Sequence, residues 1–256
     1  MPGLSDPKLL IDPREFDAVL FDMDGVVTRT ATLHSAAWKR VFDAFLKERS
    51  GSANTFRPFD EGADYLSYVD GKPRYDGVLS FLASRGISLP YGTPDDPPQL
   101  ETVCGVGNRK ELVFQSLLDA RGVEVYESTI ALISSLRAAG LKTGVFSASR
   151  HAEQMLSAAR LLSLFDERLD GIDAERLGLP GKPDPATLLE LAKRLQVSPT
   201  RTVVVEDAVA GVQAARAGAF ALVVGINRTG KTGSLLENGA DVEVIDLSEV
   251  ELASSP

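Results

Sequence analysis

The sequence predicts an α/β fold: a parallel sheet covered by helices, with a helical domain inserted into it. The first observation is a series of short apolar runs, each bounded by polar or turn residues, which predict buried strands at 19–21, 143–146, 202–205, 221–224 and 242–245. The second is that helical patterns alternate with these runs, at 128–139, 152–162, 185–195 and 209–217. The runs are apolar on both faces, which is typical of a parallel sheet with helices on two sides.

A mostly helical region separates the first two predicted strands. Between residues 30 and 123 helices are predicted at 33–49, 74–85 and 109–120, with a loop rich in Pro, Gly and Asp at 87–98. We therefore expect a core domain, residues 1–28 and 124–256, and an inserted helical cap domain, residues 29–123. An insertion at this place is expected to stand over the carboxyl ends of the strands, where ligands bind in open α/β sheets, and to act as a lid.

Composition excludes several classes of protein. The 256 residues carry a net charge of −9, with 36 acidic against 27 basic residues, which disfavours general nucleic-acid binding because that needs a basic face. No stretch approaches the ~18–20 apolar residues of a membrane span. Residues 1–14 lack the basic-then-apolar order of a signal peptide, and the single cysteine, Cys104, suits a reducing compartment. We expect a cytoplasmic protein without nucleic-acid or membrane partners, as a monomer or weak homodimer.

Two carboxylates end the first predicted strand. Asp22 and Asp24 lie two residues apart, and Gly25 follows at once. Side chains in a strand alternate faces, so the two carboxylates start on the same side. Like charges so close are costly unless a cation or a shared proton compensates them. An Asx-type turn at the strand end explains the same residues equally well, so the rest of the chain must decide.

Three further clusters follow predicted strands or lie in the loops beyond them. They are Ser147-Ala148-Ser149 after the second strand, Lys182 in a loop fixed by a glycine and two prolines, and Glu206-Asp207 after the third strand. They offer a phosphate-binding hydroxyl with backbone N–H groups, an aimed ammonium, and oxygen ligands for a hard cation such as Mg²⁺. Each alone has an ordinary explanation: a helix N-cap, an exposed lysine, or capping by Asp207.

Taken together and in this order, the four motifs resemble the haloacid dehalogenase superfamily, in its β-phosphoglucomutase-like branch with a helical cap. The resemblance implies a Rossmann-like core and magnesium-dependent phosphoryl transfer through an aspartyl phosphate. It implies that Asp22 is the nucleophile, and that Asp24 is the acid/base and also gives its main-chain carbonyl to the metal. The remaining implied roles are phosphate binding by Ser147, Ala148 and Lys182, and metal binding by Asp22, Asp24, Glu206 and Asp207.

The predicted cap carries its own part of the resemblance. Residues 30–39 and 69–74 resemble cap segments of the same branch, which implies that Arg74 holds the distal phosphate of a sugar bisphosphate. The residues expected to contact the substrate are His34, Trp38, Gly71, Lys72, Arg74 and, from the core, Ser149. From the residues alone, His34 also fits a helix surface and Trp38 also fits apolar packing.

The acceptor of the phosphoryl group decides the activity. If a sugar hydroxyl accepts it, the enzyme is a mutase that converts β-glucose 1-phosphate to glucose 6-phosphate through glucose 1,6-bisphosphate. If water accepts it, the enzyme is a phosphatase acting on a small sugar phosphate or another phosphomonoester. A cap that closes and excludes water favours the mutase.

A hypothesis from another class comes from the run 225–232. Its letters, Gly-Ile-Asn-Arg-Thr-Gly-Lys-Thr, match the pattern of a nucleotide-binding P-loop and follow an apolar run. Only 24 residues follow Thr232, which is short for the strands and the metal-binding acid that such a domain places downstream. The alternative is a polar loop at the edge of the sheet.

Overall fold

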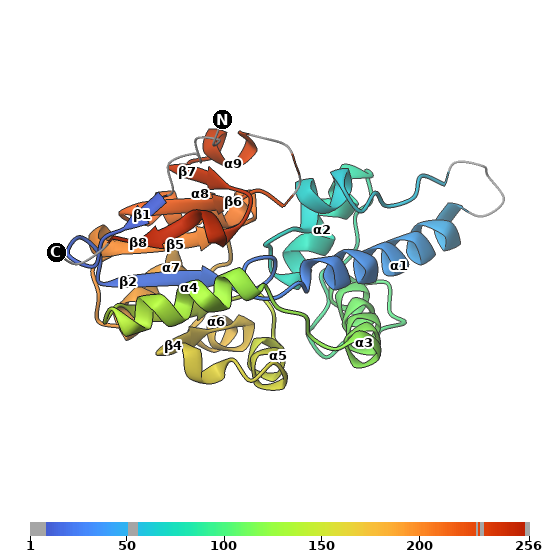
Figure 1. Cartoon of the computed structure of the whole chain (residues 1–256). Coiled ribbons are helices and arrows are strands. Elements are labelled where there is room, and N and C mark those ends of the chain that lie inside the picture. The colour runs from blue at the N-terminus through green and yellow to red at the C-terminus, as the bar shows by residue number, and fades with distance from the viewer. Residues whose placement is uncertain (1–8, 51–55, 229, 231–232, 254–256) are drawn as a thin grey trace, which may run out of the picture. The chain divides into compact units, whose positions relative to one another are not determined.

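The computed structural model describes residues 9–50, 56–228, 230 and 233–253, and Figure 1 shows its elements. Its described residues contain a parallel sheet of six strands and a pair of short parallel strands. In spatial order the sheet strands are β4 (Glu167–Leu169), β3 (Lys142–Phe146), β2 (Ala18–Asp22), β5 (Thr202–Glu206), β6 (Leu222–Ile226) and β7 (Val242–Val244). The separate pair is β1 (Leu9–Ile11) with β8 (Val250–Leu252).

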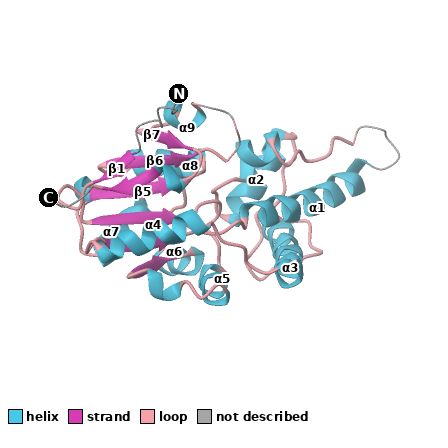
Figure 2. Cartoon of the chain, in the orientation of Figure 1, coloured by secondary structure: helices cyan, strands magenta, loops and turns pink. Residues whose placement is uncertain are grey.

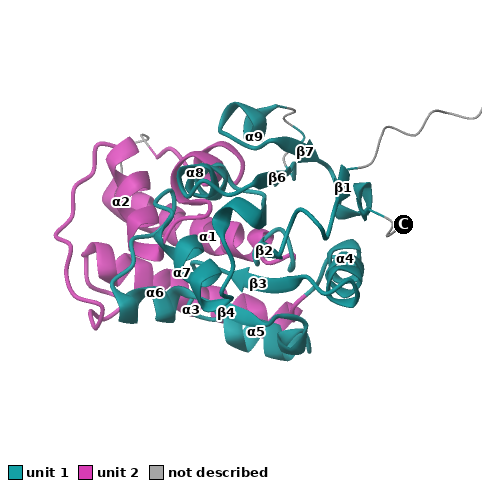
Figure 3. Ribbon diagram, turned by 90° about the vertical axis from the view of Figure 1, so that its left-hand side faces the viewer, with its two compact units in different colours: residues 1–28, 124–256 teal, residues 29–123 magenta. Residues whose placement is uncertain are grey.

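The chain divides into two units, residues 1–28 with 124–256 and residues 29–123 (Figure 3). Unit 1 holds both sheets and the later helices. These helices are α4 (Glu127–Ala138), α5 (Ala152–Ala158), α6 (Gly171–Leu177), α7 (Ala186–Arg194), α8 (Val209–Ala217), α9 (Ser234–Glu237) and the 3₁₀ turns η2 (Leu162–Leu164), η3 (Pro199–Arg201) and η4 (Leu247–Glu249).

Helices cover the sheet of unit 1 on both faces. Every residue of β2 and of β5 is buried, as the two-sided apolar runs predict. Leu20 and Val204 lie in one core cluster with residues of α7 and α8. Helix α4 packs against β3 and lies on the face turned to the viewer in Figure 2.

Strand order places the catalytic candidates together. Along the chain the sheet grows from β2 to β3 and β4 on one side, and then from β5 to β7 on the other. The order therefore reverses at β2, and open α/β sheets bind ligands at the carboxyl ends of the strands beside such a reversal. Asp22 ends β2 and Glu206 ends β5, both at this edge.

Unit 2 is helical. Its elements are α1 (Ala31–Ser50), the π-helical turn η1 (Tyr65–Val69), α2 (Arg74–Ser84) and α3 (Val103–Arg121). Its core is aromatic: Phe42 stacks on Trp38 with ring centroids 4.9 Å apart and packs on Phe81 at 4.1 Å. Residues 87–98 form the predicted loop. In the part of the chain that the structure describes, no helix is both long and apolar enough to cross a membrane.

The sequence did not predict strand β4, and it misplaced the bounds of two helices. Strand β4 has no apolar run, because it is an edge strand in which only Leu169 is fully buried. Helix α5 ends at Ala158 rather than near residue 162, since Arg160 adopts a positive φ of 59° that no helix continues. Helix α3 starts at Val103, six residues before the predicted helix.

The early start of α3 has a packing reason. Thr102 caps the helix, accepting a hydrogen bond at its Oγ1 from the N–H of Gly105 at 2.9 Å. A Cβ on Gly105 would overlap the carbonyl oxygen of Leu100, and one on Gly107 would lie 2.8 Å from the Tyr75 ring. These glycines, which weaken the helical pattern of the sequence, are therefore required by close approach.

Candidate active site

The loop after β2 is a tight, internally bonded turn. The main-chain carbonyl of Met23 accepts hydrogen bonds from the N–H groups of Val27 and Thr28, at 3.0 and 2.8 Å, and the N–H of Gly25 donates to Thr28 at 2.8 Å. Gly25 has a φ of +88°, and a Cβ there would overlap the carboxylate of Asp207. The sequence Asp-Met-Asp-Gly thus folds back on itself because glycine alone fits its turning point.

A buried lysine joins two carboxylates at the ends of β2 and β5. Lys182 donates from Nζ to Oδ1 of Asp22 at 2.5 Å and also to Oε1 of Glu206. The side chains of Lys182, Asp22 and Glu206 are 5, 6 and 0% exposed. The second oxygen of Glu206 accepts from the N–H groups of Asp207 and Ala208 at the start of α8. The lysine predicted from its rigid loop is therefore an internal cation, not a solvated one.

Burial and charge act against each other in this cluster. Burial raises the pKa of Asp22 well above its ordinary value; the Lys182 cation opposes that shift, while the charges of Glu206 and Asp24 add to it. Burial by itself would lower the pKa of Lys182, but Asp22 and Glu206 outweigh it and raise that pKa above its ordinary value. Lys182 is therefore a permanent cation beside a carboxylate that holds its protons more tightly than an exposed one.

The acidic side chains of this edge fit a divalent cation. Asp22, Glu206 and Asp207 each bring a carboxylate oxygen, and these oxygens lie within 4.8 Å of one another. An all-oxygen, mostly carboxylate donor set is the kind that hard cations prefer. The side chain of Asp24 is not in this group; its Oδ2 accepts a hydrogen bond from Ser147 Oγ at 3.0 Å. The two acids of the loop are thus placed for different work.

The loop after β3 presents a hydroxyl with an ordered backbone. Ser147, 6% exposed, accepts at Oγ from the N–H of Ser149 at 3.0 Å while it donates to Asp24. The carbonyl of Ser149 accepts from the N–H of Gly171, where a Cβ would lie 2.6 Å from the carbonyl oxygen of Ala148. Helix α6, which the sequence did not predict, thus holds the loop that carries the predicted phosphate contacts.

Within unit 2, His34 pairs with a lysine that sequence reasoning missed. Lys110 Nζ lies 2.7 Å from His34 Nδ1 and sits over the rings of Phe114 and Trp38, at 4.5 and 5.4 Å. The His34 ring stacks on Phe114 at 4.1 Å. A Lys110 ammonium donates to Nδ1 when the imidazole carries its proton on Nε2. Trp38, 5% exposed, is a core side chain of this unit.

The sequence does contain a signal for Lys110. Val106, Phe114 and Leu117 are buried on one face of α3, and Lys110 falls on the same face at helical spacing. A lysine among apolar positions is rarely buried without a partner. His34 is that partner, but the 76 residues between them hide the pairing from any local pattern.

The other predicted residues of unit 2 lie around the start of α2. Arg74 donates from Nη1 to Asn108 Oδ1 at 3.1 Å and pairs with Glu111 at 3.3 Å, so its guanidinium is held in place. Lys72 donates to Ser80 Oγ at 3.0 Å, and burial lowers its pKa. Gly71 turns the chain before α2 with a φ of +67°.

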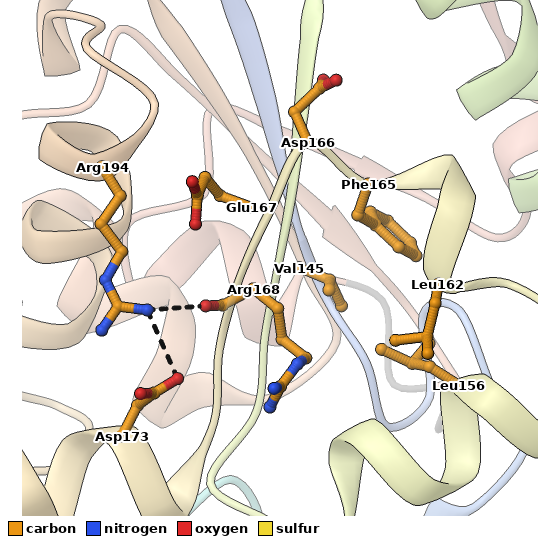
Figure 4. A pocket seen from close by; sticks show the side chains of 9 residues that line it. All are labelled: Val145, Leu156, Leu162, Phe165, Asp166, Glu167, Arg168, Asp173 and Arg194. Atoms are coloured by element: carbon orange, nitrogen blue, oxygen red, sulfur yellow. Dashed lines mark hydrogen bonds and ion pairs between the residues drawn. The ribbon is translucent and has the colours of Figure 1, made fainter.

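A pocket of about 390 Å³ lies beside the edge strand β4 (Figure 4) and is separate from the cluster of Asp22, Lys182 and Glu206. One part of its lining is apolar, from Val145, Leu156, Leu162 and Phe165, and the rest is charged. Its Arg194 donates to the main-chain carbonyl of Arg168 at 2.9 Å and to Asp173 at 3.3 Å. None of the predicted site residues lines it.

The structure contradicts the nucleotide-binding hypothesis. Gly225 and Ile226, the first two residues of the P-loop pattern, are the buried end of strand β6 rather than a loop, and Gly225 pairs with Glu206 and Glu243. A Cβ at Gly225 would press on Leu235. The described helix that follows, α9, has only four residues. Thr229, Lys231 and Thr232 of the pattern lie outside the described residues.

Comparisons with known proteins find a family and relatives that this chain resembles in sequence. The family model "Hydrolase: haloacid dehalogenase-like hydrolase" matches residues 16–218. A β-phosphoglucomutase of Mycobacterium tuberculosis (strain CDC 1551 / Oshkosh) is 46% identical over 242 residues, covering 93% of this chain and 92% of that protein. A validoxylamine A 7'-phosphate phosphatase of Streptomyces hygroscopicus subsp. limoneus is 28% identical over 239 residues, covering 92% of this chain and 96% of that protein.

A solved structure shows the same fold. The crystal structure of β-phosphoglucomutase from Clostridium difficile superposes with a TM-score of 0.72, covering 92% of this chain and 93% of that chain at 22% sequence identity. The agreement includes the inserted helical segment, since nearly all of both chains is covered. At this level of identity, the likeness describes the fold.

Proposed function

Since this chain belongs to the haloacid dehalogenase-like hydrolase family, we propose that it moves a phosphoryl group on a sugar phosphate and works as a β-phosphoglucomutase. The observation that carries the proposal is the buried contact of Lys182 with Asp22, beside the acids that end β5. It brings a buried carboxylate, a buried cation and a group of neighbouring acids to one place, which supports the roles of nucleophile, phosphate-binding cation and metal ligands. The 46% identity with a β-phosphoglucomutase over 93% of the chain supports the substrate.

Asp22 is the proposed nucleophile. Its carboxylate attacks the phosphorus of the ester, the bond to the sugar oxygen breaks, and an aspartyl phosphate forms. Lys182 stays protonated throughout, because its pKa is raised, and it balances the negative charge that gathers on the phosphoryl oxygens. Ser147 and the backbone of Ala148 bind those oxygens as well, and Ser149 beside them contacts the substrate.

Mg²⁺ is the proposed cofactor. Asp22, Asp207 and the main-chain carbonyl of Asp24 would hold it, with Glu206 beside them. When bound, the ion offsets the repulsion between the carboxylate and the phosphate. Two of the proposed acids are held in position before the ion binds. Glu206 accepts hydrogen bonds from two N–H groups at the start of α8, and the lack of a side chain at Gly25 leaves room for the Asp207 carboxylate.

Asp24 is the proposed acid and base. It protonates the leaving sugar oxygen, and it then takes the proton from the hydroxyl that accepts the phosphoryl group. Its Oδ2 accepts a hydrogen bond from Ser147 Oγ, which orients the carboxylate. Asp22 is bonded by Lys182 and Asp24 by Ser147, so that one acid can attack while the other carries protons.

Unit 2 is the proposed cap domain, which selects the substrate. We assign the distal phosphate to Arg74, which Asn108 and Glu111 keep in place. His34 presents a proton on Nε2 because Lys110 occupies Nδ1, which suits a hydrogen bond to a sugar or phosphate oxygen. Contacts from Gly71 and Lys72 complete the proposed set; Trp38, which the sequence also suggested, packs in the aromatic core of the unit instead.

A phosphatase is the second candidate, favoured by the 28% identity with a validoxylamine A 7'-phosphate phosphatase over nearly the whole chain. Phosphorus NMR separates the two. The protein is mixed with β-glucose 1-phosphate, Mg²⁺ and a trace of glucose 1,6-bisphosphate, with Asp22→Asn as the control. The mutase gives glucose 6-phosphate with little inorganic phosphate, and the phosphatase gives inorganic phosphate. If the wild-type protein forms neither product, both proposals are contradicted.

A further inference from the structure

An arginine from the loop after β6 reaches the turn that carries Asp24. Arg228 donates from Nε to the main-chain carbonyl of Gly25 at 2.8 Å. Its guanidinium lies 3.7 Å above the ring of Tyr126, and its Nη1 donates to the carbonyl of Ile245 at 3.2 Å. Three segments of unit 1 that are far apart in the sequence therefore meet at one side chain.

These segments surround the point where the chain leaves unit 1 and returns to it. Thr28 pairs with Val125 across an isolated antiparallel bridge, and the N–H of Tyr126 donates to the carbonyl of Val27 at 3.0 Å. Arg228 thus contacts the segment that leads out of unit 1, at Gly25, and the segment that leads back into it, at Tyr126. It joins the loop after β2, called the nucleophile loop below, to the segment 125–126 with which Val27 and Thr28 pair.

The guanidinium is held at a cost to the fold. Its Nη2 is buried and meets no hydrogen-bond acceptor within the described residues. The nearest carboxylate paired with it, Asp246, lies 4.0 Å from Nη1 and also accepts from Ser128. A buried donor without an acceptor is unfavourable, so its presence in a folded protein needs an explanation. Stability alone therefore does not explain this arginine.

We propose that Arg228 is a positioning residue for phosphoryl transfer, which holds the Asp24–Gly25 turn by its carbonyl. The inference rests on the function proposed above. Gly25 is where the turn touches Asp207, because a Cβ there would overlap that carboxylate. A turn free to shift at Gly25 would move Asp24, with its carboxylate and carbonyl, relative to Asp22 and Asp207. The run 225–232 thus contributes an arginine to the active-site loop instead of a nucleotide site.

The test compares Arg228→Ala with Arg216→Ala. Arg216 is a matched control, since it also donates from Nε to a glycine carbonyl, that of Gly239 at 2.9 Å, and it pairs with Asp241 away from the nucleophile loop. Misplacement of a reacting group by about 1 Å costs about 10²-fold in rate, so we expect kcat of Arg228→Ala to fall by about that factor with KM within about twofold. Arg216→Ala should keep the wild-type kcat.

Hydrogen exchange supplies a readout that does not need turnover. The N–H groups of Gly25, Val27 and Thr28 are bonded inside the turn and should exchange about tenfold faster or more in Arg228→Ala, since loss of a charge-assisted bond loosens the loop by that order. Arg216→Ala should leave them unchanged. Millimolar guanidinium should restore part of the kcat of Arg228→Ala by occupying the vacated place.

If Arg228→Ala does not fold, Arg228→Lys tests the same inference. A lysine keeps the charge but not the planar fork that bonds Gly25 while stacking on Tyr126, so kcat should still fall and the turn should still exchange faster. Unchanged kcat and exchange in the Arg228 variants, or equal effects in Arg216→Ala, would overturn the inference. If the wild-type protein is inactive on sugar phosphates, the proposed function is contradicted. The hydrogen-exchange result would then still test whether Arg228 holds the Asp24–Gly25 turn.

Discussion

Replacing Lys182 by methionine should destabilise the protein strongly and in a pH-dependent way. The substitution keeps the length of the side chain and removes the cation that contacts Asp22 and Glu206, which are 6 and 0% exposed. Breaking a buried ion pair from one side costs about 3–5 kcal/mol, because a charge is left without compensation. At roughly 2–4 °C per kcal/mol for proteins of this size, the melting temperature should fall by about 6–20 °C.

The sign of the pH dependence follows from burial. Without Lys182, the folded state holds Asp22 at a pKa above that of the unfolded chain, because burial raises it. Below the unfolded value, both states are protonated and the penalty vanishes; as pH rises, the unfolded chain ionises first and the penalty grows. The stability difference between Lys182→Met and the wild-type protein should therefore be larger at pH 8 than at pH 5.

Calorimetry at both pH values measures this difference in magnesium-free buffer. Lys193→Met is the matched control, since Lys193 is 78% exposed and pairs with Glu190 on the surface at 3.1 Å, where such pairs contribute at most about 1 kcal/mol. The double variant Lys182→Met/Asp22→Asn should regain part of the loss, because it removes one uncompensated charge. An equal loss at pH 5 and pH 8, or a loss no larger than that of Lys193→Met, would refute the reasoning.

Three further predictions concern the chemistry. Asp24→Ala should slow transfer from β-glucose 1-phosphate far more than from p-nitrophenyl phosphate, whose leaving group needs no proton; equal kcat losses would contradict the acid role. Arg74→Ala should raise KM for glucose 1,6-bisphosphate by about tenfold or more, as expected for a charge-assisted bond, and leave KM for p-nitrophenyl phosphate unchanged. Mg²⁺ should raise the melting temperature more at pH 8 than at pH 5.5, because protons compete for Asp22, whose pKa is raised; an equal shift would argue against a metal on Asp22.

Most of the sheet could be predicted from the sequence because its strands are buried on both faces. β2 and β5 are wholly buried, and such strands read as unbroken apolar runs. β4 could not be predicted, since an edge strand of sequence Glu-Arg-Leu needs little apolar surface. Its place was set by pairing with β3, which no local pattern reveals.

The candidate site could be predicted only as separate pieces. The acids were visible because they recur directly after two apolar runs, at Asp22 and Asp24 and again at Glu206 and Asp207. That Lys182 bonds both Asp22 and Glu206 was not visible, because the contacts span 160 and 24 residues of chain. The contact of Arg228 with Gly25 could not be predicted either, because it spans 203 residues. The run that contains Arg228 also matches a P-loop pattern, which suggested a nucleotide site instead.

The central claim is that Asp22 accepts the phosphoryl group. Its most direct test is acid quenching of the protein within milliseconds of mixing with glucose 1,6-bisphosphate and Mg²⁺, followed by mass spectrometry of the peptide that contains residues 18–28. The account predicts one phosphate on Asp22 and none in Asp22→Asn, which should also be inactive. Turnover that continues in Asp22→Asn, or a phosphate found on another residue of the quenched protein, would contradict it.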